Sequence, residues 1–319
     1  MHLLVPQGIG DIYWTYQLLR PLADARKIPL HFHIAAIAGH DNTGDKVVQR
    51  ARPWVSQWPG VAHVDYHEIP SPRYHWLATQ AADPFCMSNV IEAYLEGHGR
   101  ISEDPIPVAA NGWLESGRRL EGLGAPEWNP KLTLAPGFDF NLALEQLDPD
   151  DRLVAIYLSG TSDMAHPQSL GCWSAHQWAE LWRTLRARLP YDLDDTLVAF
   201  VGAHYDHAFM RRFEDIARVR RATWVIDRDP AEVLRVLHRA DLFIGFQSGL
   251  NIMADALDTA SQIMLYYPHL NDMMPTWTKP TSERQRPALH HPATFATRPE
   301  QVAEEYAAAL AERERAGVR

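Results

Sequence analysis

The sequence has few cysteines and no long apolar run, and each absence excludes a class of protein. Cys86 and Cys172 are the only two cysteines among 319 residues, and their wide separation argues against a disulfide scaffold or a zinc site. No stretch approaches the roughly 18 apolar residues that a membrane helix needs. The N-terminus lacks the pattern of a signal peptide. We therefore expect a cytoplasmic protein without a transmembrane segment.

Basic residues are also in deficit. The formal net charge is −10 and the isoelectric point is about 5.9. Proteins that bind duplex nucleic acid usually present a basic face, so the bulk charge disfavours such a partner without excluding a local basic patch. The arginines between residues 211 and 221 fall on or just after one predicted helix, for which a solvated face is the default interpretation.

Several catalytic motifs are missing as well. The chain contains neither the Gly-x-Ser-x-Gly elbow of hydrolases nor a Gly-x-x-x-x-Gly-Lys phosphate loop. Asp-x-Asp pairs, which metal-dependent sugar transferases can use, occur at 148–150, 192–194 and 227–229. Each lies in a predicted turn, where aspartate also caps helices and faces solvent. We therefore expect no metal site.

The chain does contain apolar strands that alternate with amphipathic helices. In the first half, a strand at 3–5, a glycine loop at 6–11, a helix from 12 and a strand within 28–38 form a β-loop-α-β opening, which predicts a parallel sheet. Residues 44–57 are predicted as a helix interrupted at Pro53, and residues 61–69 as a strand. Residues 70–136 are rich in proline, with helices predicted near 89–96 and 112–120.

The second half has a more regular pattern after a polar turn at 147–152. Near-continuous apolar strands are predicted at 153–158, 196–201, 223–226, 241–245 and 261–267, with helices between them, one of them at 204–220. Ser174 and Asp229-Pro230 are predicted to start two of these helices. The expected domains are residues 1–147, residues 148–298 and a C-terminal helix at 299–319.

The turn at 245–250 is the first candidate site. A buried strand ends in glycine there, and Ser248 and Gly249 open a helix. Free amides at a helix N-terminus and a serine hydroxyl suit phosphate oxygens, and glycine lets the backbone come close. On spacing alone, an ordinary strand-to-helix turn with a serine cap is the more common interpretation.

The second candidate is the loop Gly8-Ile9-Gly10-Asp11. It has the first two glycines of a dinucleotide fingerprint, but Tyr13 stands where the third would be. Asp11 follows the first strand, at the end of a parallel sheet where ligands bind, and its carboxylate could serve as a general base. The alternative role is a helix cap.

A third candidate follows the strand at 153–158. Ser159, Gly160 and Thr161 offer hydroxyls and amides to a phosphate, or form a solvated loop. After the next strand, Gly202 ends an apolar run and His204 could touch a ligand at the strand end.

Together these segments resemble the heptosyltransferase-like glycosyltransferases of family 9. Gly8-Ile9-Gly10-Asp11 matches the family's Gly-Asp opening, and Ser159-Gly160-Thr161 followed by Trp173 resembles its donor-phosphate loop. Residues 201–203 resemble the strand end before a donor-contacting turn. Residues 241–250 resemble the family signature, an Asp-Thr-Gly followed by a histidine and an apolar helix.

The sequence departs from that signature at defined positions. Gln247 replaces the family's aspartate and Ser248 its threonine, while the position expected for histidine holds Ile252 or Met253. Gly171-Cys172 occupy the place of the basic residue before Trp173. The nucleotide and sugar of the donor are therefore left open.

The resemblance implies an α/β fold of the GT-B type, with two Rossmann-like doubly wound domains facing a cleft and a C-terminal helix returning toward the first domain. It implies an inverting, metal-independent glycosyltransferase without a cofactor beyond its nucleotide-sugar co-substrate. Asp11 would be the catalytic base, and Gly10 and Tyr13 would contact the acceptor. The expected donor-binding residues are Ser159, Gly160, Thr161, Gly202, His204, Gln247, Ser248, Gly249 and Leu250.

Three alternatives stay open at this point. One is a nucleotide-sugar epimerase of the same architecture. Another is a non-catalytic protein that binds a nucleotide or nucleic acid. The third concerns the acceptor: a glycan or lipid-linked saccharide fits the acidic chain better than a hydroxymethylated base in DNA.

Overall fold

The structure is a computed structural model that describes residues 2–6, 9–37, 52, 55–56, 58–69, 106–107, 144, 147–148, 150–158, 173–266, 286–294 and 296–316. The chain divides into two compact units, Met1–Gly137 and Phe138–Arg319. From the sequence we placed the division between residues 147 and 148. The helices predicted at 89–96 and 112–120, and most of the predicted helix at 44–57, lie outside the described residues.

The first unit is built on a parallel sheet whose described strands have the order β3-β2-β1-β4. These strands are β1 (His2–Pro6), β2 (Leu30–Ile37), β3 (Val61–Ile69) and β4 (Ile106–Pro107). Helix α1 (Ile9–Arg26) connects β1 to β2. Apolar side chains of the helix and strands are fully buried in the core, among them Leu3, Ile12, Leu19, Phe32 and Ile34.

The second unit is built on a second parallel sheet, with the order β10-β9-β8-β5-β6-β7 among the described strands. The strands are β5 (Leu153–Tyr157), β6 (Leu197–Gly202), β7 (Ala222–Ile226), β8 (Leu242–Phe246), β9 (Ser261–Tyr266) and β10 (Ala288–Pro292). Strands β5, β8 and β9 are buried along their whole length. Such burial on both faces explains why these strands are continuous apolar runs in the sequence.

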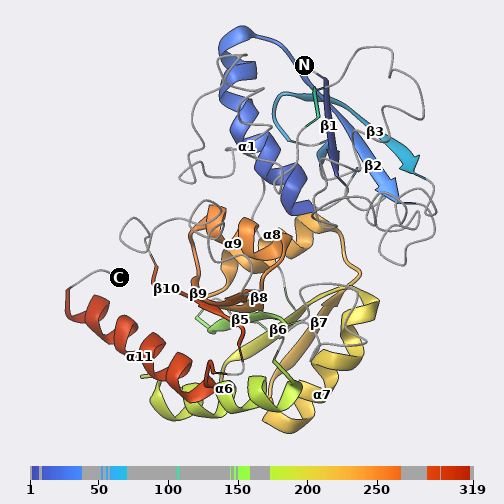
Figure 1. The fold of residues 1–319 in the computed structure, drawn as a ribbon. Helices are drawn as coiled ribbons and strands as arrows, with labels where there is room; N and C mark the ends of the chain where they lie inside the picture. Colours follow the sequence, from blue (N-terminus) through green and yellow to red (C-terminus); the bar gives the residue numbers. More distant parts are fainter. Residues whose placement is uncertain are drawn as a thin grey trace. The chain divides into compact units, whose positions relative to one another are not determined.

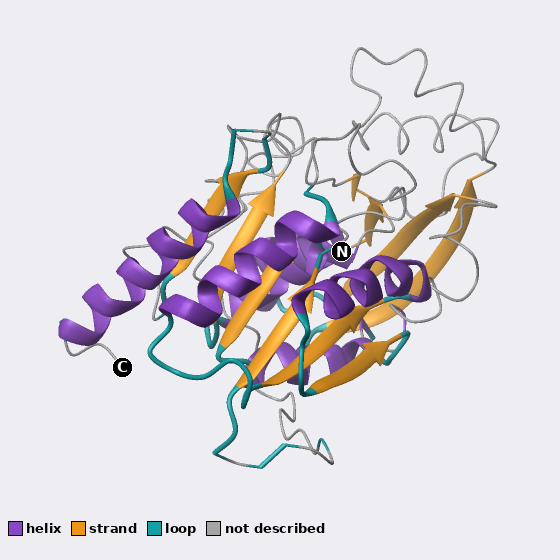
Figure 2. Ribbon diagram, turned by 90° about the horizontal axis from the view of Figure 1, so that it is seen from below, coloured by secondary structure: helices purple, strands orange, loops and turns teal. Residues whose placement is uncertain are grey.

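Helices cover both faces of the second sheet. They are α6 (Ala175–Arg188), a 3₁₀ turn (His204–Asp206) leading into α7 (His207–Ala217), α8 (Pro230–Arg239), α9 (Gly249–Leu257) and α11 (Pro299–Arg315). Figure 1 shows α6, α7 and α11 on one face and α8 and α9 on the other. Figure 2 shows the same strands from below, with helices lying over them. This is the predicted doubly wound arrangement.

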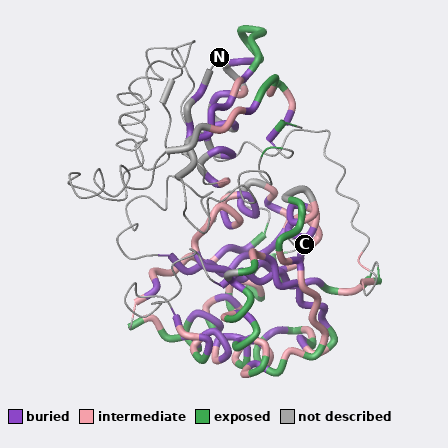
Figure 3. Tube along the Cα trace, turned by 90° about the vertical axis from the view of Figure 1, so that its right-hand side faces the viewer, coloured by how far each residue is buried: buried purple, intermediate pink, exposed green. Residues whose placement is uncertain are grey.

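The main core of the second unit lies between its sheet and α6, α7 and α11. Trp178 and Trp182 on α6 are buried, and Trp182 meets Phe213 of α7 edge to face at 6.2 Å between ring centroids. The tube in Figure 3 is buried along the strands of this unit and exposed along the outer helices. Because the strands are locked between two helical layers, their two ends are the places where ligands can approach.

Helix ends follow the predicted capping chemistry in part. Ser174 caps α6 in a reciprocal capping box with Gln177, and Pro230 is the first residue of α8. The predicted single helix at 204–220 is instead the 3₁₀ turn followed by α7. It stops at Ala217 because Arg218 takes up a left-handed conformation with φ of 53°.

One prediction near the N-terminus needs correction. Helix α1 begins at Ile9, so the predicted glycine loop at 6–11 is already helical at Gly10 and Asp11. At the other end of the chain, α11 packs on α6 and β10 of the second unit. Val302 and Tyr306 belong to the core there. The apolar face of α11 is therefore buried in the core of the second unit.

Strand β10 was not predicted. It holds two histidines and a proline, and it pairs only with β9 among the described strands. No helix in the described segments is both long and apolar enough to cross a membrane.

Candidate functional site

The order of strands in the second sheet reverses at β5. Strands β6 and β7 continue on one side of β5, and β8, β9 and β10 on the other. In open parallel sheets, ligands bind outside the carboxyl ends of the strands at such a switch point. We use "carboxyl edge" for the described turns at this end, residues 203–206, 227–229 and 247–249. The predicted contacts Ser159, Gly160 and Thr161 follow β5 but lie outside the described residues.

Gly245 lies inside β8 and serves packing. A Cβ atom at this position would come within 2.9 Å of the Phe243 ring and 3.0 Å of the Tyr157 carbonyl oxygen. The strand continues through Phe246, so the turn toward α9 begins at Gln247. The glycine that the sequence suggested as the start of a phosphate loop is therefore required by the sheet itself.

Gln247 is anchored by its backbone and has a buried side-chain oxygen. Its N–H donates to the Leu265 carbonyl at 2.7 Å, which continues the pairing of β8 with β9. Its Oε1 is buried and has no hydrogen-bond partner. A neutral amide thus stands at the position where the resemblance to family 9 predicts aspartate.

Ser248 is the N-cap residue of α9, but its side chain does not cap the helix. Its hydroxyl instead donates to Oδ1 of Asn251 at 3.0 Å. The first N–H groups of a helix have no acceptor within the helix, so those of Gly249 and Leu250 remain available. Gln247, Ser248, Gly249 and Leu250 are all partly exposed. This helix start can accept an anionic oxygen.

Asn251 is a contributor that the sequence did not reveal. Its side chain is 2% exposed, and its Nδ2 atom has no hydrogen-bond partner. Because Oδ1 faces the Ser248 hydroxyl, Asn251 fixes that hydroxyl beside the open amides. The spacing Ser-x-x-Asn at a helix start was the available signal, since side chains three residues apart meet at a cap.

The turn after β6 is held by Asp206. This carboxylate is fully buried, and its Oδ2 accepts from the Ala203 N–H at 2.8 Å. A Cβ atom on Gly202 would approach Oδ2 to 2.7 Å, so this close approach requires glycine. Gly202 therefore shapes the turn, and its role as a donor contact remains a prediction.

His204 follows this turn and joins it to the end of β7. Its N–H donates to Oδ1 of Asp227 at 3.1 Å, and its Nδ1 lies 3.5 Å from Oδ2 of the same carboxylate. The His204 side chain is 61% exposed, so it remains accessible at the carboxyl edge. Asp227 adopts a φ of 55°, a left-handed conformation that aspartate tolerates.

In the first unit, Asp11 is the third residue of α1 and follows the carboxyl end of β1. That position lies within the first helical turn, so the alternative role as the N-cap residue does not fit. Carboxylates are stabilised in the first turn of a helix by the exposed N–H groups. Strand β1 lies between β2 and β4, where the order of the first sheet also reverses.

The two predicted acceptor contacts are buried. Gly10 has little exposed surface, and the Tyr13 side chain is fully buried with its ring 5.5 Å from that of Trp58. In this structure Tyr13 packs the core of the first unit and offers no surface to an acceptor. Its apolar neighbours at helical spacing were the sequence signal for such a core position.

The acidic pairs have structural partners where the structure describes them. Asp192 accepts from the Asp194 N–H at 2.8 Å, and Asp194 forms an ion pair with Arg186 at 3.0 Å. Asp227 holds His204. Among the described residues, no group of three or more histidine, cysteine, aspartate or glutamate side chains could hold a metal ion.

Comparison with known proteins finds similarity in structure but not in sequence. No protein-family model matches the chain, and no curated protein matches it. The ADP-heptose LPS heptosyltransferase II of Escherichia coli superimposes with a TM-score of 0.57 at 16% identity, covering 98% of this chain and 100% of that one. A family 9 glycosyltransferase of Veillonella parvula gives a TM-score of 0.57 at 13% identity, covering 98% of each chain.

A third solved structure carries a different activity. A protein assigned as a UDP-N-acetylglucosamine 2-epimerase, from Listeria monocytogenes, gives a TM-score of 0.51 at 10% identity. It covers 98% of this chain and 89% of its own. The same architecture therefore occurs in proteins with different reactions, and the likeness defines the fold.

Two parallel-sheet units and near-complete coverage identify the architecture as that of the GT-B glycosyltransferases. Within that class, the chain has the fold of the heptosyltransferases and other family 9 enzymes, as its sequence resemblance predicted.

Proposed function

We propose that this protein is a glycosyltransferase that moves a sugar from a nucleotide-sugar donor to an acceptor hydroxyl. The observation that carries the proposal is the open start of α9 at the carboxyl edge. There, Ser248 leaves the helix amides uncapped and a buried Asn251 amide holds its hydroxyl. Near-complete coverage of two glycosyltransferases by the fold supports the assignment.

The second unit would bind the donor diphosphate. The amides of Gly249 and Leu250 would donate hydrogen bonds to phosphate oxygens. On binding, the Ser248 hydroxyl would exchange its Asn251 acceptor for a phosphate oxygen, and Ser159, Gly160 and Thr161 would be further contacts after β5. Hydrogen bonds to a charged group are stronger than neutral ones. They would also stabilise the charge that develops on the leaving nucleoside diphosphate. Gln247, Gly202 and His204 would complete the donor site.

Asp11 would act as the general base. In the proposed step, its carboxylate takes the proton of the acceptor hydroxyl while the acceptor oxygen forms a bond to the anomeric carbon. The bond from that carbon to the phosphate oxygen breaks, and the nucleoside diphosphate leaves with the electron pair. Attack opposite the leaving group inverts the anomeric configuration. This scheme needs no metal ion and no cofactor beyond the donor.

The acceptor is proposed to be a glycan or a lipid-linked saccharide in preference to a DNA base. A net charge of −10 disfavours the phosphate backbone of DNA. Because Tyr13 is buried, Gly10 is the remaining predicted acceptor contact, and it would act through its backbone.

A panel of UDP-, ADP-, GDP- and CMP-sugars in thermal unfolding tests the proposal. We expect one nucleotide class to raise the melting temperature in a saturable way. Incubation of that donor without an acceptor then separates the two activities of this architecture. An epimerase releases an epimerised nucleotide sugar, whereas a transferase leaves the sugar configuration unchanged. Absence of stabilisation by every nucleotide sugar would remove the main support.

A further inference from the structure

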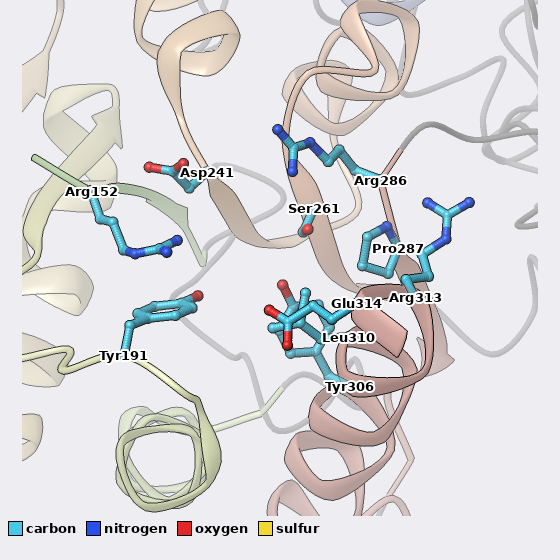
Figure 4. A pocket seen from close by; sticks show the side chains of 10 residues that line it. All are labelled: Arg152, Tyr191, Asp241, Ser261, Arg286, Pro287, Tyr306, Leu310, Arg313 and Glu314. Carbon is cyan, nitrogen blue, oxygen red and sulfur yellow. The ribbon is translucent and has the colours of Figure 1, made fainter. Parts of the chain in front are cut away.

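A pocket of about 360 Å³ opens at the opposite end of the second sheet (Figure 4). Its walls come from residues just before β5, β8 and β10, from the first residue of β9, from Tyr191 between α6 and β6, and from α11. We call these strand beginnings the amino edge. A volume of this size lies within the range of sites for small molecules.

The pocket is separate from the donor site. Asp241 precedes β8 and lines the pocket, whereas Ser248 follows the same strand. The five residues of β8 span about 16 Å at roughly 3.3 Å per residue. A small molecule in one site therefore cannot reach the other.

Three arginines from three segments line the pocket: Arg152, Arg286 and Arg313. Figure 4 shows the Arg152 side chain extended across the Tyr191 ring toward the interior. Its guanidinium carbon lies 4.1 Å from the ring centroid, a contact that holds the group in one orientation. Guanidinium groups bind phosphate oxygens through paired N–H donors.

The acidic residues of the lining only partly offset this charge. Oδ2 of Asp241 accepts from the Leu153 N–H at 2.9 Å and lies 3.6 Å from Arg239, which is not a lining residue. Glu314 is the other carboxylate, and Figure 4 shows it directed into the pocket near Tyr306. With three guanidinium groups against two carboxylates, the lining keeps a formal excess of one positive charge.

The remaining lining suits a polar carbon skeleton. Ser261 and Tyr306 are buried, hydrogen-bonded side chains on the floor, and Leu310 adds an apolar surface. Burial raises the pKa of Tyr191 to about 12, and Arg152 opposes this shift only in part. The Tyr191 phenol is therefore neutral near pH 7 and can donate a hydrogen bond.

We propose that this pocket binds a small organic phosphate, of the size of a sugar phosphate, as a second ligand site of the protein. The guanidinium groups bind the phosphate, and the tyrosine and serine hydroxyls and Leu310 contact the carbon skeleton. Because α11 forms one wall and the strand beginnings form the others, the ligand joins them and stabilises the second unit.

Thermal unfolding and calorimetric titration of the full chain with glucose 6-phosphate test this proposal, with inorganic phosphate and potassium chloride at equal ionic strength for comparison. We expect a saturable rise in melting temperature with glucose 6-phosphate, and weaker binding of inorganic phosphate. Arg313→Gln and Arg286→Gln should each weaken binding about tenfold or more, because each removes a charged hydrogen-bond donor.

Arg315→Gln is the matched control. Arg315 lies in the same last turn of α11 and is exposed, and it does not line the pocket. It removes the same charge and should leave the affinity unchanged, as should Ser248→Ala at the carboxyl edge. Unfolding of each variant without ligand shows whether it remains folded.

Three results would overturn the proposal. The first is a glucose 6-phosphate effect no larger than that of potassium chloride. The second is equal weakening by Arg315→Gln and Arg313→Gln, or loss of binding in Ser248→Ala. The third is equal affinity for inorganic phosphate, which would contradict the assigned contacts to the carbon skeleton.

Discussion

The two edges of the second sheet are formed by the same strands but have different chemistry. At the amino edge, charged side chains connect the residues that precede the strands through ion pairs and hydrogen bonds. Arg221 forms an ion pair with Asp151 at 2.7 Å, and Arg239 donates to the Asp151 carbonyl at 2.6 Å. These contacts link the segments that precede β5, β7 and β8.

The carboxyl edge instead has glycine, small hydroxyl and amide groups and an uncapped helix start. Ser248 leaves the first amides of α9 open, and Gly202 permits a close turn over Asp206. Parallel strands followed by helices collect helix N-termini at this edge, and with them partial positive charge. The amino edge therefore stabilises the sheet, whereas the carboxyl edge carries the groups that the proposed diphosphate would contact.

The largest expected effect concerns Asp11, which follows the carboxyl end of β1 in the first sheet. Asp11→Asn should lower kcat by about 10² to 10⁴-fold, because a general base contributes that much, while the KM for the donor stays near that of the unmodified protein. Steady-state kinetics with the donor found in the panel measure both. Asp24→Asn, on the same helix in an exposed ion pair with Arg20, is the control. Normal turnover in Asp11→Asn would remove Asp11 from the mechanism.

Gly245→Ala should lower the free energy of unfolding by about 1–3 kcal/mol, as expected for overpacking. The new Cβ would meet the Phe243 ring at 2.9 Å and the Tyr157 carbonyl. Chemical denaturation measures the loss. Affinity of the folded variant for nucleotide should be nearly unchanged, because Gly245 packs the sheet and does not contact the ligand. A stable variant that no longer binds nucleotide would reverse this division of roles.

Ser174→Ala should cost about 1 kcal/mol of stability without changing nucleotide affinity. Ser174 and Ser248 both precede helices, but only the Ser174 side chain accepts from a helix amide, the Gln177 N–H. Denaturation and titration of the two alanine variants compare them. Equal loss of nucleotide affinity in both variants would show that Ser248 has no special role.

The smallest effect is expected at the amino edge and depends on pH. The side-chain hydrogen bond from Arg221 lowers the pKa of Asp151 below its ordinary value of 3.8. A lowered folded-state pKa gives stability that is present above that ordinary value and is lost as pH falls through the folded-state pKa. Asp151→Asn should therefore lower the melting temperature slightly at pH 7, and this difference should vanish in strong acid. A difference independent of pH would contradict the ion-pair explanation.

Periodicity and capping residues predicted much of the second unit. Continuous apolar runs indicated β5, β6, β8 and β9, and Ser174 marked the start of α6. Strand β10 was missed because its histidines and proline carry no strand signal, and pairing with β9 determines it. The packing of α11 on α6 was also missed, since an amphipathic pattern shows that a face is buried but not against what.

For the candidate site, the sequence indicated positions better than roles. Ser248 and Gly249 do lie at the start of a helix that follows a buried strand. The roles of Gly245 in packing and of Asn251 in holding Ser248 depend on neighbours that meet only in the fold. Tyr13 was placed near the acceptor, but its burial reflects packing on Trp58, far along the chain.

The most direct test of a diphosphate site at the carboxyl edge is calorimetric titration of a nucleoside diphosphate into three proteins. They are the unmodified chain, Ser248→Ala and Arg313→Gln. We expect Ser248→Ala to weaken binding about tenfold or more, through loss of a hydrogen bond to a charged group, and Arg313→Gln to leave it unchanged. The opposite pattern, with binding retained in Ser248→Ala and weakened in Arg313→Gln, would place the nucleotide at the amino edge and contradict the proposed function.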